Sequence, residues 1–256
     1  MSADDSTSQR PAEPTGLVVA SRVYPQTLPI LPLPVRPIFP NTVAPLLVVD
    51  PIPVRMFEEL LEVPQPLLGL VLSKKSQDDD VHTDRNEPQP VEGRPAFDRL
   101  HHVGVIAQVL KAQRQGDKGP YQILCGGLDR FTLVRPMMTE PHLVAQIRYE
   151  YEVKQEVDGE LRAYALAVIN TVRELIELDP LFKQELNLLV QQGSIEEPGR
   201  LADFAAYLTS AKGDKLQAVL ECFDVRRRLE MSLELLRGEI DISKLQAEIR
   251  ANIEER

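Results

Sequence analysis

Residues 28–50 read LPILPLPVRPIFPNTVAPLLVVD, an apolar segment interrupted by six prolines. Proline fixes φ and lacks a backbone N–H donor, so this segment cannot form a helix. Proline is also largely confined to sheet edges, strand starts and bulges. We therefore predict a short edge strand at residues 31–35, a turn at residues 40–42 and a buried strand at residues 46–49.

The rest of the first half of the chain favours a small, mostly antiparallel, curled sheet with one or two helices. Residues 53–61 have the apolar spacing of a short helix, and residues 76–95 are polar enough for a long surface loop. We expect Gly126-Gly127 to interrupt the sheet as a bulge or sharp bend. Further strands are predicted at residues 67–72, 103–110, 121–125, 131–135 and 144–151.

The second half of the chain has helical periodicity almost throughout. Apolar residues recur at i, i+3, i+4 and i+7 from Leu161, and Asp224 is a good N-cap for a long final helix. The apolar stripe of that helix is still running at Leu245 and Ile249, so beyond Ile240 we expect either a helix that projects and self-associates as a coiled coil, or one that frays. Helices are predicted at residues 161–176, 181–191, 198–208 and 213–223, and from residue 225 onward.

These patterns divide the chain into three parts. Residues 1–26 are predicted to be a disordered tail, since they have neither a basic n-region nor a continuous apolar h-region. Residues 27–153 form the β-rich domain, and residues 159–256 form an α-helical bundle. The predicted fold class is therefore α+β, with a curled antiparallel sheet followed by helices.

Composition argues against several functions. The net charge of −10 disfavours general binding to nucleic acid, which needs clustered Lys and Arg. No run of 18 apolar residues is present, so no membrane span is expected and the chain is predicted to be cytoplasmic. Cys125 and Cys222 have no metal or redox spacing, and we expect two buried, reduced thiols.

The sequence lacks the common motifs for catalysis and cofactor binding. The chain has no GxxxxGK[ST] phosphate loop and no GxSxG elbow. The four histidines do not have zinc spacing, and the run 78–80 of three aspartates is not followed by an EF-hand pattern. We predict no catalytic residue, no metal and no cofactor, and we expect the run 226–228 of three arginines to be solvated.

Seven segments of the chain form a recognisable series, namely LPL at residues 31–33, FP at 39–40, PL at 45–46, VGVIA at 103–107, GLDRF at 127–131, EPGRLAD at 197–203 and residues 215–240. Together these segments resemble the N-terminal region of Lon, the ATP-dependent protease. The similarity spans roughly residues 28–249 in the order of the family, although Gly126 replaces a commonly acidic residue and the loop 76–95 is longer than usual.

The resemblance implies a PUA-like β fold followed by a helical bundle, acting as a non-catalytic region for substrate recognition and assembly. Its implied partners are unfolded or damaged polypeptides and the ATPase and peptidase domains that follow in the family. Met137 and Met138 are weak candidates for contact with polypeptide, because Met adapts to varied partners. Ordinary packing of both residues remains the alternative.

Two other functions remain open at this stage. PUA-like folds also host small ligands and RNA, so a standalone ligand- or RNA-binding module is the alternative, although the acidic charge speaks against RNA. The sequence contains no catalytic motif that would support a self-contained enzyme. The amphipathic pattern of the last helix continues to the end of the given sequence without a Gly or Pro to end it, which favours a fragment over a standalone protein.

Overall fold

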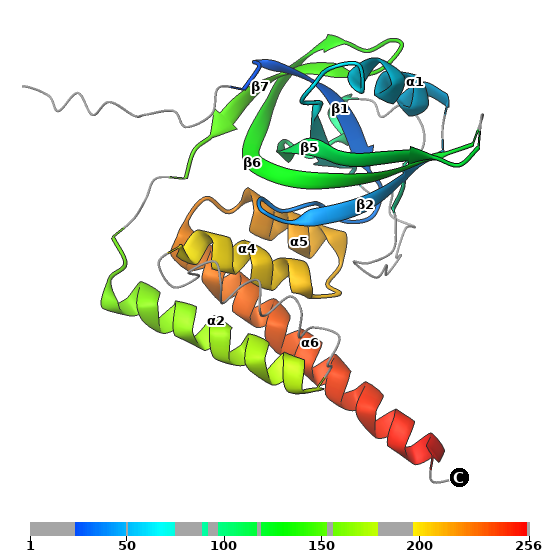
Figure 1. The fold of residues 1–256 in the computed structure, drawn as a ribbon. Helices are drawn as coiled ribbons and strands as arrows, with labels where there is room; N and C mark the ends of the chain where they lie inside the picture. The colour runs from blue at the N-terminus through cyan, green and yellow to red at the C-terminus, as the bar shows by residue number, and fades with distance from the viewer. Residues whose placement is uncertain are drawn as a thin grey trace, which may run out of the picture.

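The computed structural model has a β-barrel on one side and a helical bundle on the other (Figure 1). Helices α4 and α5 lie between the barrel and helices α2 and α6 (Figure 1). The residues that the structure describes are 24–49, 51–74, 89–91, 97–116, 119–152, 156–178 and 197–254.

Within those residues the strands form one sheet that closes on itself. Its order is β4-β2-β6-β5-β3-β1-β7, and β7 also pairs with the second half of β6. The long β6 can serve both neighbours because β2 pairs with its first residues and β7 with its last. The strands are β1 Thr27–Leu33, β2 Val43–Val48, β3 Leu67–Leu72, β4 Gln89–Val91, β5 Val103–Arg114, β6 Tyr121–Met138 and β7 Val144–Glu150.

The first proline-rich strand lies inside the sheet, so its predicted edge position was wrong. The first half of β1 pairs with β7, and its second half pairs in parallel with β3. Proline removes only the donor of a residue, and the carbonyls of the strand still accept hydrogen bonds. The Leu33 carbonyl, for example, accepts from the Ser73 N–H at 2.9 Å.

The turn predicted at residues 40–42 is confirmed. Asn41 has a φ of 60°, a left-handed conformation that Asn tolerates. Thr42 closes the turn, because its Oγ1 donates to the Phe39 carbonyl at 2.7 Å. Strand β2 follows directly and so begins three residues earlier than predicted.

Strand β6 is continuous through Gly126-Gly127, so the predicted interruption was wrong. The irregularities fall on either side, as register shifts against β5 between Val105 and Ala107 and between Val109 and Lys111. Gly127 is needed for close approach instead, since a Cβ there would collide with the Phe39 carbonyl oxygen. Its N–H donates to the Thr42 carbonyl at 2.8 Å, which fastens the turn to the barrel.

The predicted surface loop at residues 76–95 lies mostly outside the described residues. Its described part, Gln89–Val91, is the short strand β4, which pairs in parallel with β2 and contradicts an entirely irregular loop. The predicted helix at residues 181–191 also lies outside the described residues, as do residues 1–23 of the predicted tail. Residues 24–26 are described, and the Gln26 carbonyl accepts from the Ile147 N–H at 3.0 Å.

The helical bundle begins where Asp158 caps α2 by accepting from the Leu161 N–H at 2.7 Å. Asp224 caps α6 in the same way, through the Arg227 N–H at 2.7 Å, as predicted. The apolar faces of α2, α4 and α6 meet in one core that includes Val168, Leu201 and Leu229. The helices are α1 Pro51–Leu60, α2 Gly159–Leu178, α4 Pro198–Leu208, α5 Gly213–Glu221 and α6 Val225–Glu254, with a short 3-10 helix at Phe97–Arg99.

The last turns of α6 extend beyond the bundle (Figure 1). The apolar stripe of α6 is buried from Val225 to Ile240, whereas Leu245 and Ile249 are about half exposed. A helix without tertiary contacts gains little stability, so we expect amide protection to fall steeply after Ile240 in dilute protein. Hydrogen exchange measured by segment at two concentrations checks this. Protection that rises with concentration would indicate self-association, whereas strong, concentration-independent protection through Ile253 in a monomer would contradict the prediction.

Candidate functional site

The barrel and the helices meet in a continuous apolar interface. Phe39, Val103 and Val105 from the barrel side pack with Ala206 of α4 and Leu216 of α5, and all five are buried. Gly213, at the start of α5, lies so close to the barrel that a Cβ there would collide with the Val35 carbonyl oxygen. The position of α4 and α5 relative to the barrel is therefore determined by tight packing.

Two buried arginines of the barrel side bind the carboxyl ends of these helices. Arg36 donates to the carbonyls of Tyr207 and Thr209, at 3.0 and 3.4 Å, where α4 ends. Arg130 of β6 donates through Nε to the Leu220 carbonyl, at 2.9 Å, in the last turn of α5. A helix leaves its last carbonyls without intrahelical partners and carries partial negative charge there, so a cation stabilises that end.

Arg130 also forms a buried ion pair with Asp203 of α4. Its Nη1 and Nη2 donate to the two carboxylate oxygens at 2.8 and 2.5 Å. Arg228 of α6 approaches the same carboxylate, with Nε 3.3 Å from Oδ1, and its side chain is 1% exposed. Arg228 also pairs with Glu152, which follows β7. Burial disfavours the charged form of Arg228, but Asp203 and Glu152 outweigh burial and raise the pKa of its guanidinium.

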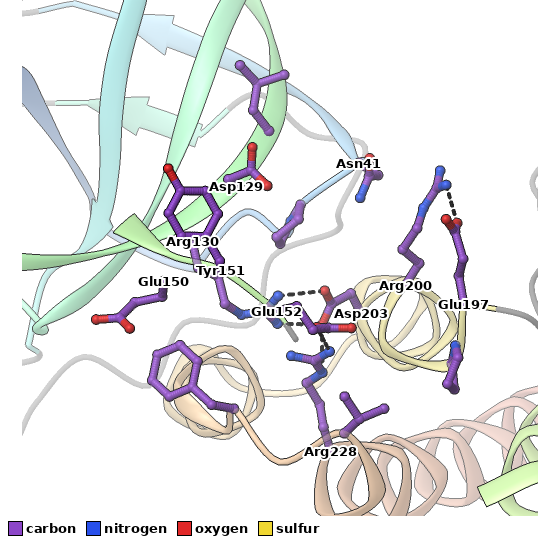
Figure 2. Close-up of a pocket in the computed structure, with 15 residues that line it drawn as sticks. Asn41, Asp129, Arg130, Glu150, Tyr151, Glu152, Glu197, Arg200, Asp203 and Arg228 are labelled. Atoms are coloured by element: carbon purple, nitrogen blue, oxygen red, sulfur yellow. Dashed lines mark hydrogen bonds and ion pairs between the residues drawn. The ribbon is translucent and has the colours of Figure 1, made fainter. Parts of the chain in front are cut away.

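These groups lie at the bottom of a cleft between the barrel and the bundle (Figure 2). The cleft has a volume of about 500 Å³. Two aromatic side chains that line it are largely exposed, Tyr151 at 61% and Phe223 at 47%. The cleft thus combines exposed apolar surface with a buried charged base, and it offers contacts both to apolar groups and to ions.

The sequence did not predict this cleft, and the run 226–228 was interpreted incorrectly at one position. Arg226 and Arg227 are exposed as expected, but Arg228 is buried. A signal was present, because Arg228 stands three residues after Val225 and four before Ser232, both buried on the same helical face.

The predicted candidates Met137 and Met138 lie elsewhere, at the far end of β6. Their exposed fractions are 53% and 38%, and Val134 of the same strand is 50% exposed. We call these three side chains the β6 apolar end. The structure does not bring them to the cleft between the barrel and the bundle, which is lined by other residues.

A second exposed apolar group lies on the outer face of the barrel and was missed from the sequence. It comprises Val43, Leu110 and Leu124, with exposed fractions of 44%, 53% and 36%. Alternation along β2 and β6 was the available signal, since inward and outward residues follow each other there. Leu110 breaks that alternation, because it lies at a register shift of β5.

Within the described ranges, no group of His, Cys, Asp and Glu could hold a metal ion. His101 pairs with Glu221 instead, with Nδ1 3.2 Å from Oε1. The expectation of two buried thiols is confirmed for Cys125 only, because Cys222 is partly exposed. Burial raises the pKa of the Cys125 thiol to about 12, so this side chain is an apolar core group rather than a nucleophile. None of the helices described here is long and apolar enough to cross a membrane.

The family model described as ATP-dependent protease La (LON) substrate-binding domain matches residues 27–238. The chain belongs to this family. Lon protease 1 of Syntrophotalea carbinolica is 36% identical over 241 residues, and Lon protease of Chlamydia trachomatis is 36% identical over 230 residues. These alignments cover 94% and 90% of the chain, but only 28% and 26% of the two relatives. The LON substrate-binding family thus accounts for nearly the whole chain, and the chain spans about a quarter of each relative.

Solved structures of the same family share the fold. The N-terminal domain of a Mycobacterium avium complex Lon protease superposes with a TM-score of 0.57 at 18% identity, over 82% of this chain and 98% of that one. A Lon N-terminal domain protein from Xanthomonas campestris gives 0.54 at 15% identity, over 81% and 97%. The predicted α+β class, with a sheet followed by helices and a long final helix, is confirmed.

Proposed function

We propose that this chain recognises polypeptide substrates for a Lon-type protease and performs no catalysis itself. The observation that carries the proposal is the match of the LON substrate-binding family model over residues 27–238. The substrates we expect are damaged, misfolded or short-lived regulatory proteins, and the work of ATP hydrolysis and peptide cleavage belongs to domains outside this chain. The absence of phosphate-loop and nucleophile motifs agrees with this division.

The surface chemistry suits ligands that expose apolar side chains. The β6 apolar end and the Val43, Leu110 and Leu124 group are exposed apolar surfaces on rigid strands. Folded proteins bury such side chains, whereas unfolded ones expose them, so contact with these surfaces favours the unfolded form. Methionine adds a flexible, polarisable side chain that adapts to partners of different shape.

We further propose that residues 27–153 and 159–256 are separate domains joined by the buried interface of α4 and α5. Their partners would be unfolded polypeptides, the ATPase and peptidase domains of a longer protein, and further copies of this chain through α6. The proposed location is the cytoplasm, without contact with membranes or nucleic acid. The acidic net charge of −10 supports the last point.

Substitution of both Met137 and Met138 by Ser is expected to weaken binding of an unfolded polypeptide about tenfold. The physical reason is the loss of apolar area that binding would remove from water, discounted for the cost of association. Fluorescence anisotropy of a labelled unfolded protein measures the effect. The matched control is Leu166→Gln, which removes a side chain of 43% exposure from α2, on the far side of α4 and α5 from the barrel. Equal affinities of the double variant and the control for the unfolded protein would exclude the β6 apolar end as the contact surface. If the unaltered chain does not bind the unfolded protein at all, the proposed function is refuted.

A further inference from the structure

The buried base of the cleft between the barrel and the bundle contains more positive than negative charge. Two guanidinium groups, of Arg130 and Arg228, share the carboxylate of Asp203, and all three side chains are at most 6% exposed. One positive charge is left to be balanced. The balancing carboxylate comes from Glu152, whose side chain is 42% exposed. A buried cation therefore depends on a counter-ion that is itself half in solvent.

The place where this carboxylate lies has the features of a built anion site. Arg228 Nη2 donates to Glu152 Oε2, whereas the buried Arg228 Nε lies 3.3 Å from Asp203 Oδ1 but makes no hydrogen bond. The other Glu152 oxygen lies where a side chain of Gly199 would be, in the first turn of α4. The start of a helix attracts negative charge, and the cap residue Glu197 makes no side-chain capping bond there.

Other acidic side chains of the cleft have partners that reduce their repulsion of an anion. Glu150 accepts from Arg148 at 3.0 Å and from Thr132 at 2.6 Å. Glu197 pairs with Arg200, and Asp129 accepts from the Tyr24 hydroxyl at 2.5 Å. Figure 2 shows the Arg228 guanidinium directed at Glu152 and Asp203, with Glu150 directed away.

We propose that this site accepts a carboxylate from a bound polypeptide in place of Glu152. The exchange needs only a rotation of the half-exposed Glu152 side chain, and the cleft of about 500 Å³ leaves space for the incoming group. Tyr151 and Phe223 then provide apolar contacts for the neighbouring residues of the ligand. The inference rests on the proposed function, since it assumes that polypeptide is the ligand, and it adds a preference for acidic side chains or a chain terminus.

The anion site is tested without any polypeptide by Glu152→Ala. Sodium formate is expected to raise the melting temperature of this variant by a few degrees over sodium chloride of equal ionic strength, because formate binds only the folded state. The unaltered chain and the control Glu150→Ala should show no such difference, since Glu152 still occupies the site. Glu152→Gln, which keeps the shape of the side chain, should respond less than Glu152→Ala. No difference between formate and chloride for Glu152→Ala would overturn the proposal.

The polypeptide ligand is tested with four matched apolar peptides. They carry a central Glu or Gln, and each has either a free or an amidated carboxyl terminus. Glu152→Ala is expected to bind peptides with the favoured carboxylate about tenfold more tightly than their neutral partners, as for a charge-assisted hydrogen bond. The Glu/Gln and free/amidated comparisons distinguish a side chain from a terminus. Equal binding of all four would overturn the inference and leave the proposed function intact, whereas binding of none would overturn both.

Discussion

Asp203→Ala is expected to lower the free energy of unfolding by about 3–5 kcal/mol, because it leaves two buried guanidinium groups without their shared carboxylate. Arg130 and Arg228 are 6% and 1% exposed, so water cannot replace the lost partner. Urea unfolding followed by circular dichroism measures the change.

The matched control is Arg226→Ala, at an exposed position of α6 two residues before Arg228. Arg226 pairs with Asp158 and Glu160 at 3.0 and 2.7 Å, but its side chain is 42% exposed. Exposed pairs contribute about 0–1 kcal/mol, so this variant should be nearly as stable as the unaltered chain. A loss below 1 kcal/mol for Asp203→Ala would show that the buried network does not hold α4, α6 and the barrel together.

Phe131→Ala is expected to destabilise the barrel by about 3–5 kcal/mol, because a fully buried ring is removed and the space cannot collapse completely. The Phe131 ring packs over two glycines of neighbouring strands, and a Cβ on Gly69 or on Gly104 would come within 2.8 Å of Cζ. Gly104 is also its direct partner across β5 and β6. The ring and the glycines therefore form one packing unit, which thermal or urea unfolding can test.

A double-mutant cycle makes this prediction specific. Gly69→Ala alone should be destabilising, because the added Cβ would lie only 2.6 Å from Ile30 Cδ1 and 2.8 Å from Phe131 Cζ. In the Phe131→Ala background the ring is absent, so the same substitution should cost clearly less. Equal costs in both backgrounds would contradict the packing described here.

Individual strands and helices could be predicted from the sequence where a hydrophobic periodicity or a helix cap determines them. The strand predicted at residues 67–72 coincides with β3, and Asp224 caps α6 as expected. The order of sheet and bundle could also be predicted, because the periodicity changes from strand-like to helical between residues 153 and 159.

The failures share one cause, which is contact between segments distant in sequence. β1 was placed at an edge because its prolines lack donors, but two strands more than 30 residues away pair with it. Arg228 was read as solvated because a carboxylate 25 residues earlier in α4 could not be foreseen as its partner. The cleft between the barrel and the bundle depends on the same contacts, so the charge network at its base could not be predicted from local patterns.

The central claim is that the chain distinguishes unfolded from native polypeptide, and a paired titration tests it most directly. The chain contains no tryptophan, so the fluorescence of a tryptophan-containing protein reports on that ligand alone. We expect the unfolded form to bind at least about tenfold more tightly than the native form, with little change between low and high salt, since apolar contacts are not screened. Equal affinity for the two forms, or binding only to RNA with a steep loss in salt, would contradict the account.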